Sequence, residues 1–200
     1  ELIEQYGKLD KRIKIIKRTK EKGLTSAIKA GCLMSKGDYM AVMDSDGQHD
    51  IETLLYLIKE LDDKEFLDIV IASRFLKDSI IETFSYKRKL ISITGNYLAK
   101  ISLHHNYCDL SDYLSGCFVM KKKNCKEFIS KIDIEGFKFL YELLFESEGK
   151  LNIQEKPFVF LFRRHGKSKL NLYIMWIYLS SVLKKLLMNL RNTIIQNILK

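Results

Sequence analysis

Short apolar runs alternate with segments of helical periodicity, and this alternation restricts the fold more than any other feature of the sequence. Residues 12–16 (RIKII), 39–43 (YMAVM) and 66–72 (FLDIVIA) have the length and β-favouring content of buried strands. Between them, apolar residues recur at helical spacing over 23–34 and 51–61. Strands joined by helices in this way are typical of an open α/β sheet with mostly parallel strands.

After residue 72 the alternation of apolar runs with helical segments is less regular but continues. A polar loop leads to a helix predicted over 87–103, followed by a short apolar segment, 117–120. A further helix is expected over 137–146 and a strand over 152–162. One folded domain of about this size can bury a core of its own.

The last segment is different, because its apolar residues form a long amphipathic helix. Lys184 and Lys185 interrupt the apolar run before it reaches the roughly 20 residues that span a bilayer, which favours a helix lying on a membrane. The alternative is a helix packed on the protein's own core or on a partner helix. We therefore divide the chain into residues 1–169, which we expect to form the main folded domain, and residues 170–200, which we expect to form a membrane-associating helix. The apolar stripe comprises Leu172, Met175, Trp176, Leu179, Leu183, Leu186, Leu187 and Leu190.

The formal net charge of +9 is concentrated near the C-terminus. Residues 151–200 contain nine Lys or Arg and a single acid, Glu155. Such a basic region attracts phosphate groups of lipids, small substrates or nucleic acids. Nucleic acid is disfavoured, because the aromatic residues Tyr173, Trp176 and Tyr178 lie among aliphatic residues and not among arginines on a sheet.

The four cysteines do not indicate a metal site. They form no C-x-x-C pair and have no histidine at ligand spacing, which fits a reduced compartment. His104 and His105 adjoin in sequence but lack the further nearby ligands that zinc requires, so we expect ordinary loop histidines.

Two carboxylates, Asp44 and Asp46, follow the YMAVM run directly. Open α/β sheets bind ligands at the carboxyl ends of their strands, and paired carboxylates leave positions on Mg²⁺ or Mn²⁺ free for phosphates. An EF-hand is excluded, because its twelfth position would be Leu55. The structural alternative is a turn and helix cap, since Asp50 precedes the helix that begins near residue 51.

Seven motifs in order give these residues a context. Residues 22–52 resemble the segment of polyprenyl-phosphate glycosyltransferases, of the dolichol-phosphate mannose synthase-like type in family 2, in which a G-L-x-x-A helix leads to a strand and a D-x-D-x-Q-H motif. The resemblance extends from about residue 12 to 170. Its later motifs are Ser73-Arg74, then Arg88, Ser92 and Asn96 on one helix, Asp112-x-x-Ser115-Gly116, GFKFLYELL with Glu142, Glu155-x-Pro157, and Arg163-x-x-Gly166-x-Ser168-Lys169.

The resemblance implies a Rossmann-like sheet of the glycosyltransferase A type. It also implies roles for particular residues, with Asp46 and Arg163 as the catalytic pair. Asp44, Asp46 and Gln48 resemble the site for Mg²⁺ or Mn²⁺ and the donor diphosphate. Arg74, Arg88 and Ser92 resemble the clamp for an acceptor phosphate, and Arg163, Ser168 and Lys169 a mobile loop that closes over both substrates.

The expected activity is inverting transfer of a hexose from a nucleotide diphosphate sugar to a polyprenyl (dolichyl or undecaprenyl) phosphate. A phosphate monoester with a second pKa of about 6 is already a nucleophile near neutral pH, so no strong general base is needed. The expected location is the cytoplasmic face of a membrane, as a peripheral protein. Two alternatives are a family 2 enzyme acting on a polysaccharide or protein with an Asp base, and a truncated, non-catalytic membrane-binding module.

The sequence departs from the family pattern at its start. Family members begin with a strand, a P-x-Y-N-E-like turn and a second strand that holds the nucleotide base, and these residues are not found here. The sequence therefore predicts a sheet without its first strands and with one exposed edge. His49-Asp50 also replaces the usual H-P, with little expected effect on catalysis.

Overall fold

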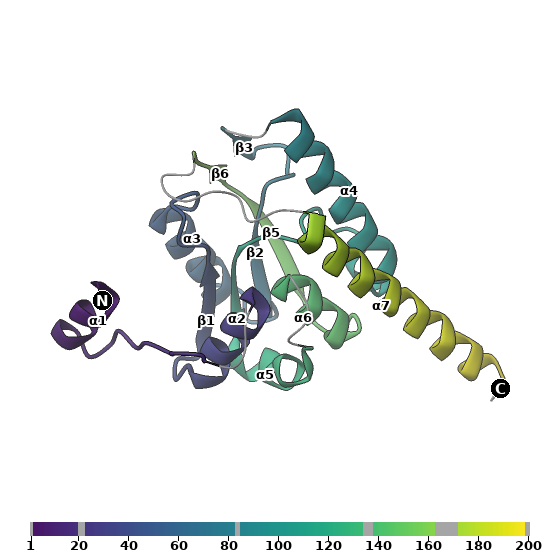
Figure 1. The fold of residues 1–200 in the computed structure, drawn as a ribbon, viewed down its shortest axis with the longest axis horizontal. Coiled ribbons are helices and arrows are strands. Elements are labelled where there is room, and N and C mark those ends of the chain that lie inside the picture. The colour runs from purple at the N-terminus through teal and green to yellow at the C-terminus, as the bar shows by residue number, and fades with distance from the viewer. Residues whose placement is uncertain (1, 20–22, 83–84, 134–137, 163–171, 199–200) are drawn as a thin grey trace.

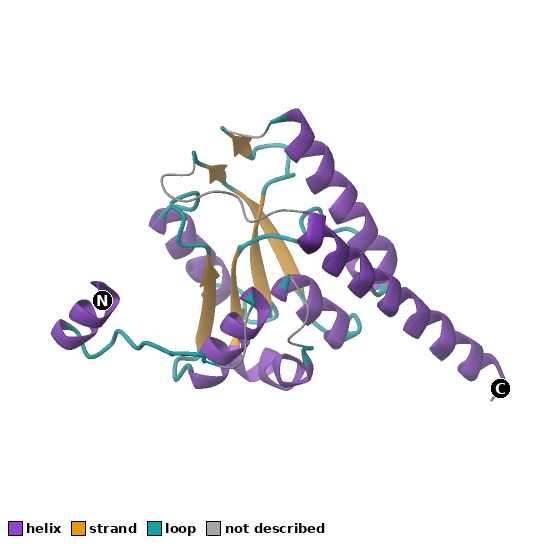
Figure 2. Cartoon of the chain, viewed as in Figure 1, coloured by secondary structure: helices purple, strands orange, loops and turns teal. Residues whose placement is uncertain are grey.

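The computed structural model describes residues 2–19, 23–82, 85–133, 138–162 and 172–198 (Figure 1). Helices and strands alternate through most of this length (Figure 2). Their bounds are α1 Leu2–Leu9, α2 Leu24–Met34, β1 Tyr39–Met43, α3 Ile51–Asp62, β2 Ile69–Ser73, β3 Ile80–Ile81, α4 Tyr86–Ser102, β4 Cys117–Lys121, α5 Lys122–Lys131, α6 Phe139–Ser147, β5 Ile153–Pro157, β6 Val159–Phe160 and α7 Leu172–Ile198.

The main sheet has the strand order β1-β4-β2-β5. β4 pairs antiparallel with both β1 and β2, while β5 is parallel to β2. Three of the four strands therefore share one direction, as in the predicted mostly parallel sheet, and β4 runs against them. The short strands β3 and β6 form a separate parallel pair.

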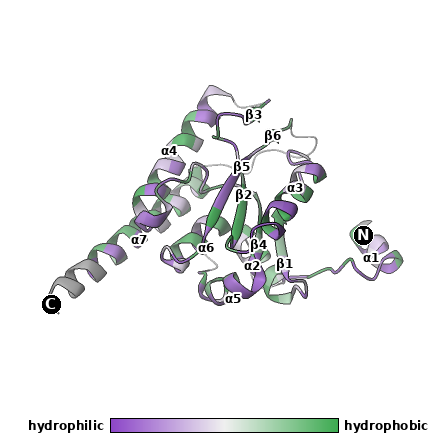
Figure 3. Ribbon diagram, turned by 180° about the vertical axis from the view of Figure 1, so that it is seen from behind, coloured by the Kyte–Doolittle hydropathy of each residue, from purple (hydrophilic) through white to green (hydrophobic). Residues whose placement is uncertain are grey.

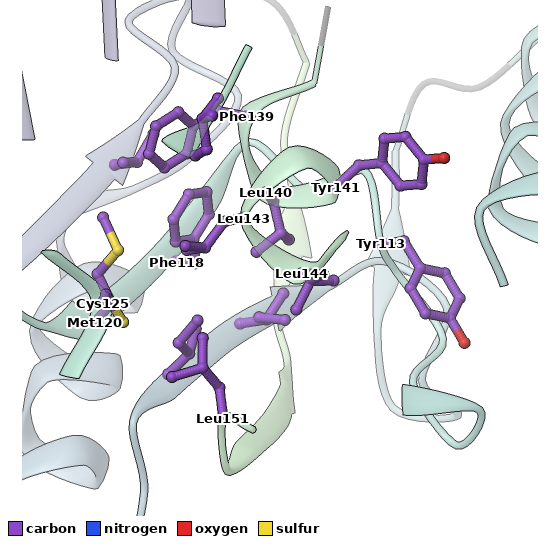
Figure 4. Packing of buried hydrophobic residues seen from close by; sticks show 14 of the residues in the cluster. Tyr113, Phe118, Met120, Cys125, Phe139, Leu140, Tyr141, Leu143, Leu144 and Leu151 are labelled. Carbon is purple, nitrogen blue, oxygen red and sulfur yellow. The ribbon is translucent and has the colours of Figure 1, made fainter. Parts of the chain in front are cut away.

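Helices cover both faces of the sheet, and the side chains of each strand alternate between the two faces. Along β4, Phe118 and Met120 enter the larger core cluster, which lies under α2, α5 and α6. Cys117 and Val119 enter the smaller cluster on the α3 side. Figure 4 shows Phe118 of β4 and Phe139 of α6 within the larger cluster, and their rings stack with centroids 6.2 Å apart. Each such side chain contributes about 1.5–3 kcal/mol when buried.

The C-terminal helix α7 packs along α4 (Figure 1). The Tyr178 hydroxyl donates to the Gly95 carbonyl at 2.7 Å, and Val182 is buried. Lys185 is also buried and forms an ion pair with Glu142 of α6 at 2.5 Å. One face of α7 is thus part of the folded core, as the alternative interpretation of this helix required.

Large apolar side chains are exposed on the opposite face of α7 and on the neighbouring helix α4. Figure 3 shows hydrophobic stretches along both helices. The expected stripe is therefore present, but most of it faces away from the core. Within the described chain no helix is long and apolar enough to cross a membrane. The exposed residues are Leu172, Tyr173, Trp176, Leu179, Leu183, Leu187 and Leu190 on α7 and Tyr86, Leu90, Ile93, Tyr97 and Ile101 on α4.

Two strand predictions are corrected by the structure. Residues 12–16 form no strand: residue 12 lies in a turn, and no described strand pairs with residues 13–16. The predicted strand over 152–162 is divided at Phe158 into β5 and β6. β5 ends at Pro157, which has no N–H to donate, and the chain then leaves the main sheet to pair with β3.

Candidate functional site

The direction of the strands brings three motifs to one edge of the sheet. β1, β2 and β5 share a direction, so the residues after β1 and β2 emerge at the same edge. β4 runs the other way, and the D-x-x-S-G segment that precedes it therefore reaches this edge as well. Asp44, Arg74 and Asp112 are consequently neighbours, although they are far apart in the sequence.

The loop after β1 presents the two predicted metal-binding carboxylates. Asp44 and Asp46 are both half-buried, and Asp46 Oδ1 accepts a hydrogen bond from the backbone N–H of Gln48 at 3.1 Å. Gly47 has a φ of 79°, a left-handed conformation that glycine adopts without strain. The helix cap is a third residue, Asp50, whose carboxylate accepts from the Thr53 N–H at 2.6 Å. Capping of α3 therefore does not account for Asp44 or Asp46.

Gln48 ties this loop to the segment after β6. Its side-chain amide donates to the Leu161 carbonyl at 3.2 Å, and its own carbonyl accepts from the Leu161 N–H at 3.0 Å. Gln48 is only 1% exposed, so it fixes the loop from beneath, and its role as a metal ligand stays a prediction.

The neighbouring His49 is buried between two aromatic rings. It stacks on Phe158 with ring centroids 5.2 Å apart and meets Phe160 edge-on. Burial lowers the pKa of His49, and its Nδ1 has no hydrogen-bond partner among the described residues. The neutral His49 ring therefore packs as an apolar group against Phe158 and Phe160, next to the Asp44–Asp46 loop.

Arg74 is the centre of a buried ionic network. Its Nε and Nη2 each donate to Asp112 at 2.7 Å, a bidentate arrangement. Burial by itself would lower the pKa of Arg74, but Asp112 and Asp44 outweigh it and raise that pKa. Glu155 of β5 in turn accepts from the backbone N–H groups of Ser111 and Asp112. Burial raises the pKa of Glu155 despite these bonds.

Arg88, Ser92 and Asn96 lie one turn apart on the inner side of α4. Asn96 accepts from the Tyr113 N–H at 2.8 Å and donates to the Ser92 carbonyl at 3.0 Å, which connects α4 to the D-x-x-S-G segment. Arg88 and Ser92 are half-buried and belong to the same stripe. The predicted phosphate-binding residues of α4 thus face the edge where Asp44 and Arg74 lie.

The sequence motifs gave no role to Lys138, which precedes α6. Its charge interacts with those of Arg74, Asp44, Asp112 and Arg88, and burial, followed by Arg74, lowers its pKa. The site therefore combines at least three cations with the carboxylates of the β1 loop. The signal was the lysine of GFKFLYELL, but without a fold nothing connected it to Asp44.

The remaining predicted residues, Arg163, Ser168 and Lys169, lie outside the described residues. Residues 138–162 lead up to this segment, and Leu161, bonded to Gln48, is two residues before Arg163. Their predicted roles stay predictions.

The carboxylate oxygens of the loop after β1 suit a hard divalent cation that keeps some of its coordination positions open for substrate. Within the described ranges no three His, Cys, Asp or Glu side chains form a ready metal cluster. Asp44 and Asp46 supply two carboxylates, and the Asp44 carboxylate accepts no hydrogen bond from the described residues. Mg²⁺ commonly binds through one or two carboxylates and substrate phosphates, so these residues fit such an ion.

Comparison with known proteins identifies the family. The model of glycosyl transferase family 2 matches residues 1–128. The chain belongs to this family. The family 2 chain is also 37% identical over 173 residues to a dolichol-phosphate mannosyltransferase of Pyrococcus furiosus, covering 85% of this chain and 47% of that relative. A dolichol-phosphate mannosyltransferase of Saccharomyces cerevisiae is 34% identical over 178 residues, covering 85% and 63% of the two chains.

A solved structure with the same fold supports the fold class of this family 2 chain. The crystal structure of glucosyl-3-phosphoglycerate synthase from Mycobacterium tuberculosis, in complex with Mn²⁺, UDP-glucose and glycerol 3-phosphate, aligns with a TM-score of 0.55 at 18% identity. The alignment covers 86% of this chain and 56% of that one. The predicted open α/β sheet of the glycosyltransferase A type is thereby confirmed. The chain spans 47% and 63% of the two mannosyltransferases and 56% of the synthase, which is about half to two thirds of their length.

Proposed function

We propose that this protein transfers a hexose from a nucleotide diphosphate sugar to a polyprenyl phosphate, with inversion, at a membrane surface. The observation that carries the proposal is the meeting of the Asp44–Asp46 loop with Arg74, Arg88 and Lys138 at one sheet edge. Carboxylates with a metal suit the donor's diphosphate, and the cations suit a second phosphate beside it.

Each group has a chemical task in this proposal. Asp44 and Asp46 would hold Mg²⁺ or Mn²⁺, which neutralises the departing nucleotide diphosphate when bound. Lys138 and Arg88 would hold the acceptor phosphate, whose oxygen attacks the anomeric carbon. Arg74 is oriented by Asp112, so it supplies a fixed positive charge and not a mobile clamp. The acceptor oxyanion needs no protein base, and catalysis consists of positioning and charge stabilisation.

The relatives support the acceptor class. Both named relatives are dolichol-phosphate mannosyltransferases, and the matched region includes the Asp44–Asp46 loop and Arg74. A peripheral location at the cytoplasmic face of a membrane accords with the exposed apolar surface of α4 and α7. Residues 1–169 would then form the catalytic domain, and α7 would place it against the lipid headgroups.

The test is transfer of label from radioactive GDP-mannose and UDP-glucose to dolichyl phosphate in detergent with Mn²⁺. We expect label in the organic-extractable lipid, and an Asp44→Asn variant should lower it about 100-fold or more. The exposed Asp63→Asn is the matched control and should retain activity. Label in polymer instead of lipid would favour the polysaccharide alternative. No transfer from either donor would favour the non-catalytic module.

A further inference from the structure

Gly116 lies directly opposite Asp44, at the end of the β1-β4 ladder. The antiparallel register pairs Met43 with Cys117, so Asp44 and Gly116 form the next pair beyond the last ladder residues. That pair lies at the sheet edge where the candidate site is. β1 thus supplies the carboxylate, and the segment before β4 supplies the backbone on which it lies.

The Asp44 carboxylate occupies the space where a side chain on residue 116 would be. A Cβ on Gly116 would be 2.4 Å from Asp44 Oδ2 and 3.0 Å from Asp44 Cγ. Real Cβ atoms do not approach other heavy atoms to 2.4 Å, so the carboxylate would have to turn away. Gly116 is not among the glycines with positive φ. The need for glycine at position 116 therefore comes from the lack of space for a side chain. The backbone conformation of Gly116 itself would allow alanine.

The backbone at Gly116 cannot easily move back from Asp44. The hydroxyl of the preceding Ser115 donates to the Ala72 carbonyl of β2 at 2.7 Å and accepts from the Cys117 N–H at 3.2 Å. Cys117 is already part of the β4 ladder. Of the two partners in this contact, the Asp44 side chain is the one that can move.

Asp44 interacts with the charges of Arg74 and Lys138, which attract its carboxylate but do not fix its direction through a hydrogen bond. Its carboxylate accepts no hydrogen bond from the described residues, in contrast to Asp46, Asp50 and Asp112. We propose that Gly116 is a positioning residue: the absence of its side chain lets Asp44 lie over the backbone and present its carboxylate to the metal and diphosphate. This inference rests on the proposed function and adds a residue to it.

The first experiment is metal-free thermal unfolding of Gly116→Ala in two backgrounds. In the parent, the contact with Asp44 should lower the unfolding temperature by about 2–4 °C. In an Asp44→Ala background the carboxylate is absent, so the same change should have no effect. Gly31→Ala on α2 is the matched control, because nothing lies within 4 Å of its added Cβ. Equal effects of Gly116→Ala in both backgrounds would refute the contact.

The second experiment measures binding of Mn²⁺ alone, by the electron paramagnetic resonance of the free ion. Gly116→Ala should weaken Mn²⁺ binding at least about tenfold, and Gly31→Ala should not change it. Parent-like Mn²⁺ binding by a folded Gly116→Ala variant would overturn the inference and leave the proposed function intact. If the parent itself binds no Mn²⁺, the metal site of the proposed function fails, and this inference fails with it.

Discussion

At the scale of single residues, Arg74 shows how one side chain serves both folding and chemistry. The sequence assigned it to an acceptor phosphate, whereas the structure pairs it with Asp112 in a bidentate ion pair. Asp112 has no exposed side-chain surface. A carboxylate buried this completely must keep a charged partner, so Arg74 stabilises the fold as well as the site.

Arg74→Ala should therefore lower the free energy of unfolding by about 3–5 kcal/mol, because it leaves the Asp112 charge buried and unpaired. Urea denaturation measures this change. The double variant Arg74→Ala with Asp112→Asn should recover a large part of the loss, since no buried charge remains. Stability of the single variant within experimental error of the parent would show that the ion pair contributes only to binding.

Glu60 gives a prediction for pH dependence. Hydrogen bonds from Lys156 and Lys64 lower the pKa of Glu60 from 4.5 to about 2. Because the pKa in the folded state lies below that of the unfolded chain, this stabilisation is complete above pH 4.5 and is lost as the pH falls toward about 2. Thermal unfolding should show Glu60→Gln less stable than the parent at neutral pH, with the difference vanishing across this range.

The control for Glu60 is Glu52→Gln on the same helix, because Glu52 is exposed and has no ion pair among the described residues. Removal of this carboxylate should therefore change stability much less at neutral pH than Glu60→Gln does. A Glu60→Gln difference that stays constant from neutral pH down to about pH 2 would contradict the assignment.

At the scale of elements, α7 has a buried inner face and an exposed outer face. The inner face holds Lys185, whose ammonium pairs with Glu142 and lies 4.5 Å from the centre of the Phe145 ring. Ser181 donates to the same carboxylate at 3.0 Å. These contacts join the last helix to α6, which begins beside Lys138 of the candidate site.

Lys185→Met should destabilise the protein by about 3–5 kcal/mol, because Glu142 would keep a buried charge without its cation. Chemical denaturation of Lys185→Met and of Lys185→Met with Glu142→Gln measures the coupling. The double variant should be the more stable of the two. If the single variant were as stable as the parent, α7 would not be anchored through this pair.

Most elements could be predicted from the sequence because their periodicity is local. The helices at α2, α3, α4 and α6 and the strand β1 are confirmed near their expected bounds. α5 was missed because its lysine-rich sequence buries only Cys125 and Ile129. The strand over 12–16 was wrong for a non-local reason: a strand needs a neighbour, and periodicity does not reveal one.

The candidate site was predictable only in part, for the same reason. Asp44 and Asp46 could be predicted because two carboxylates directly after a predicted strand are a local signal in the sequence. Lys138 and Gly116 both belong to sequence motifs, but the sequence does not show that they act on Asp44. Lys138 interacts with the Asp44 charge and Gly116 lies against the Asp44 carboxylate because the topology brings them together. The ion pair of Arg74 with Asp112 joins residues separated by 38 positions, and no spacing rule connects them.

At the scale of the whole molecule, the helices α4 and α7, which pack against each other, both expose large apolar side chains. A double variant, Trp176→Ser with Leu183→Ser, should abolish flotation with vesicles that contain anionic lipid, because both residues lie on the outer face of α7. Its unfolding temperature should stay close to that of the parent, since neither side chain is buried.

The matched control for flotation is Ile3→Ser with Leu9→Ser, which removes exposed apolar residues from α1, a helix that lies away from α7 (Figure 1). This control should still float. Equal loss in both double variants would indicate nonspecific adhesion, and no loss in the α7 variant would remove that helix from the membrane contact.

The antiparallel strand β4 has a consequence for how the chain reaches its native state. β1 and β2 follow one another in the sequence, but they form no hydrogen bonds with each other. Each of them pairs instead with residues 117–121 of β4, which lie between them. On a ribosome, residues 117–121 must emerge before the centre of the sheet can form. During synthesis β1 and β2 then remain without their central neighbour β4. We therefore expect slow folding and a need for chaperones.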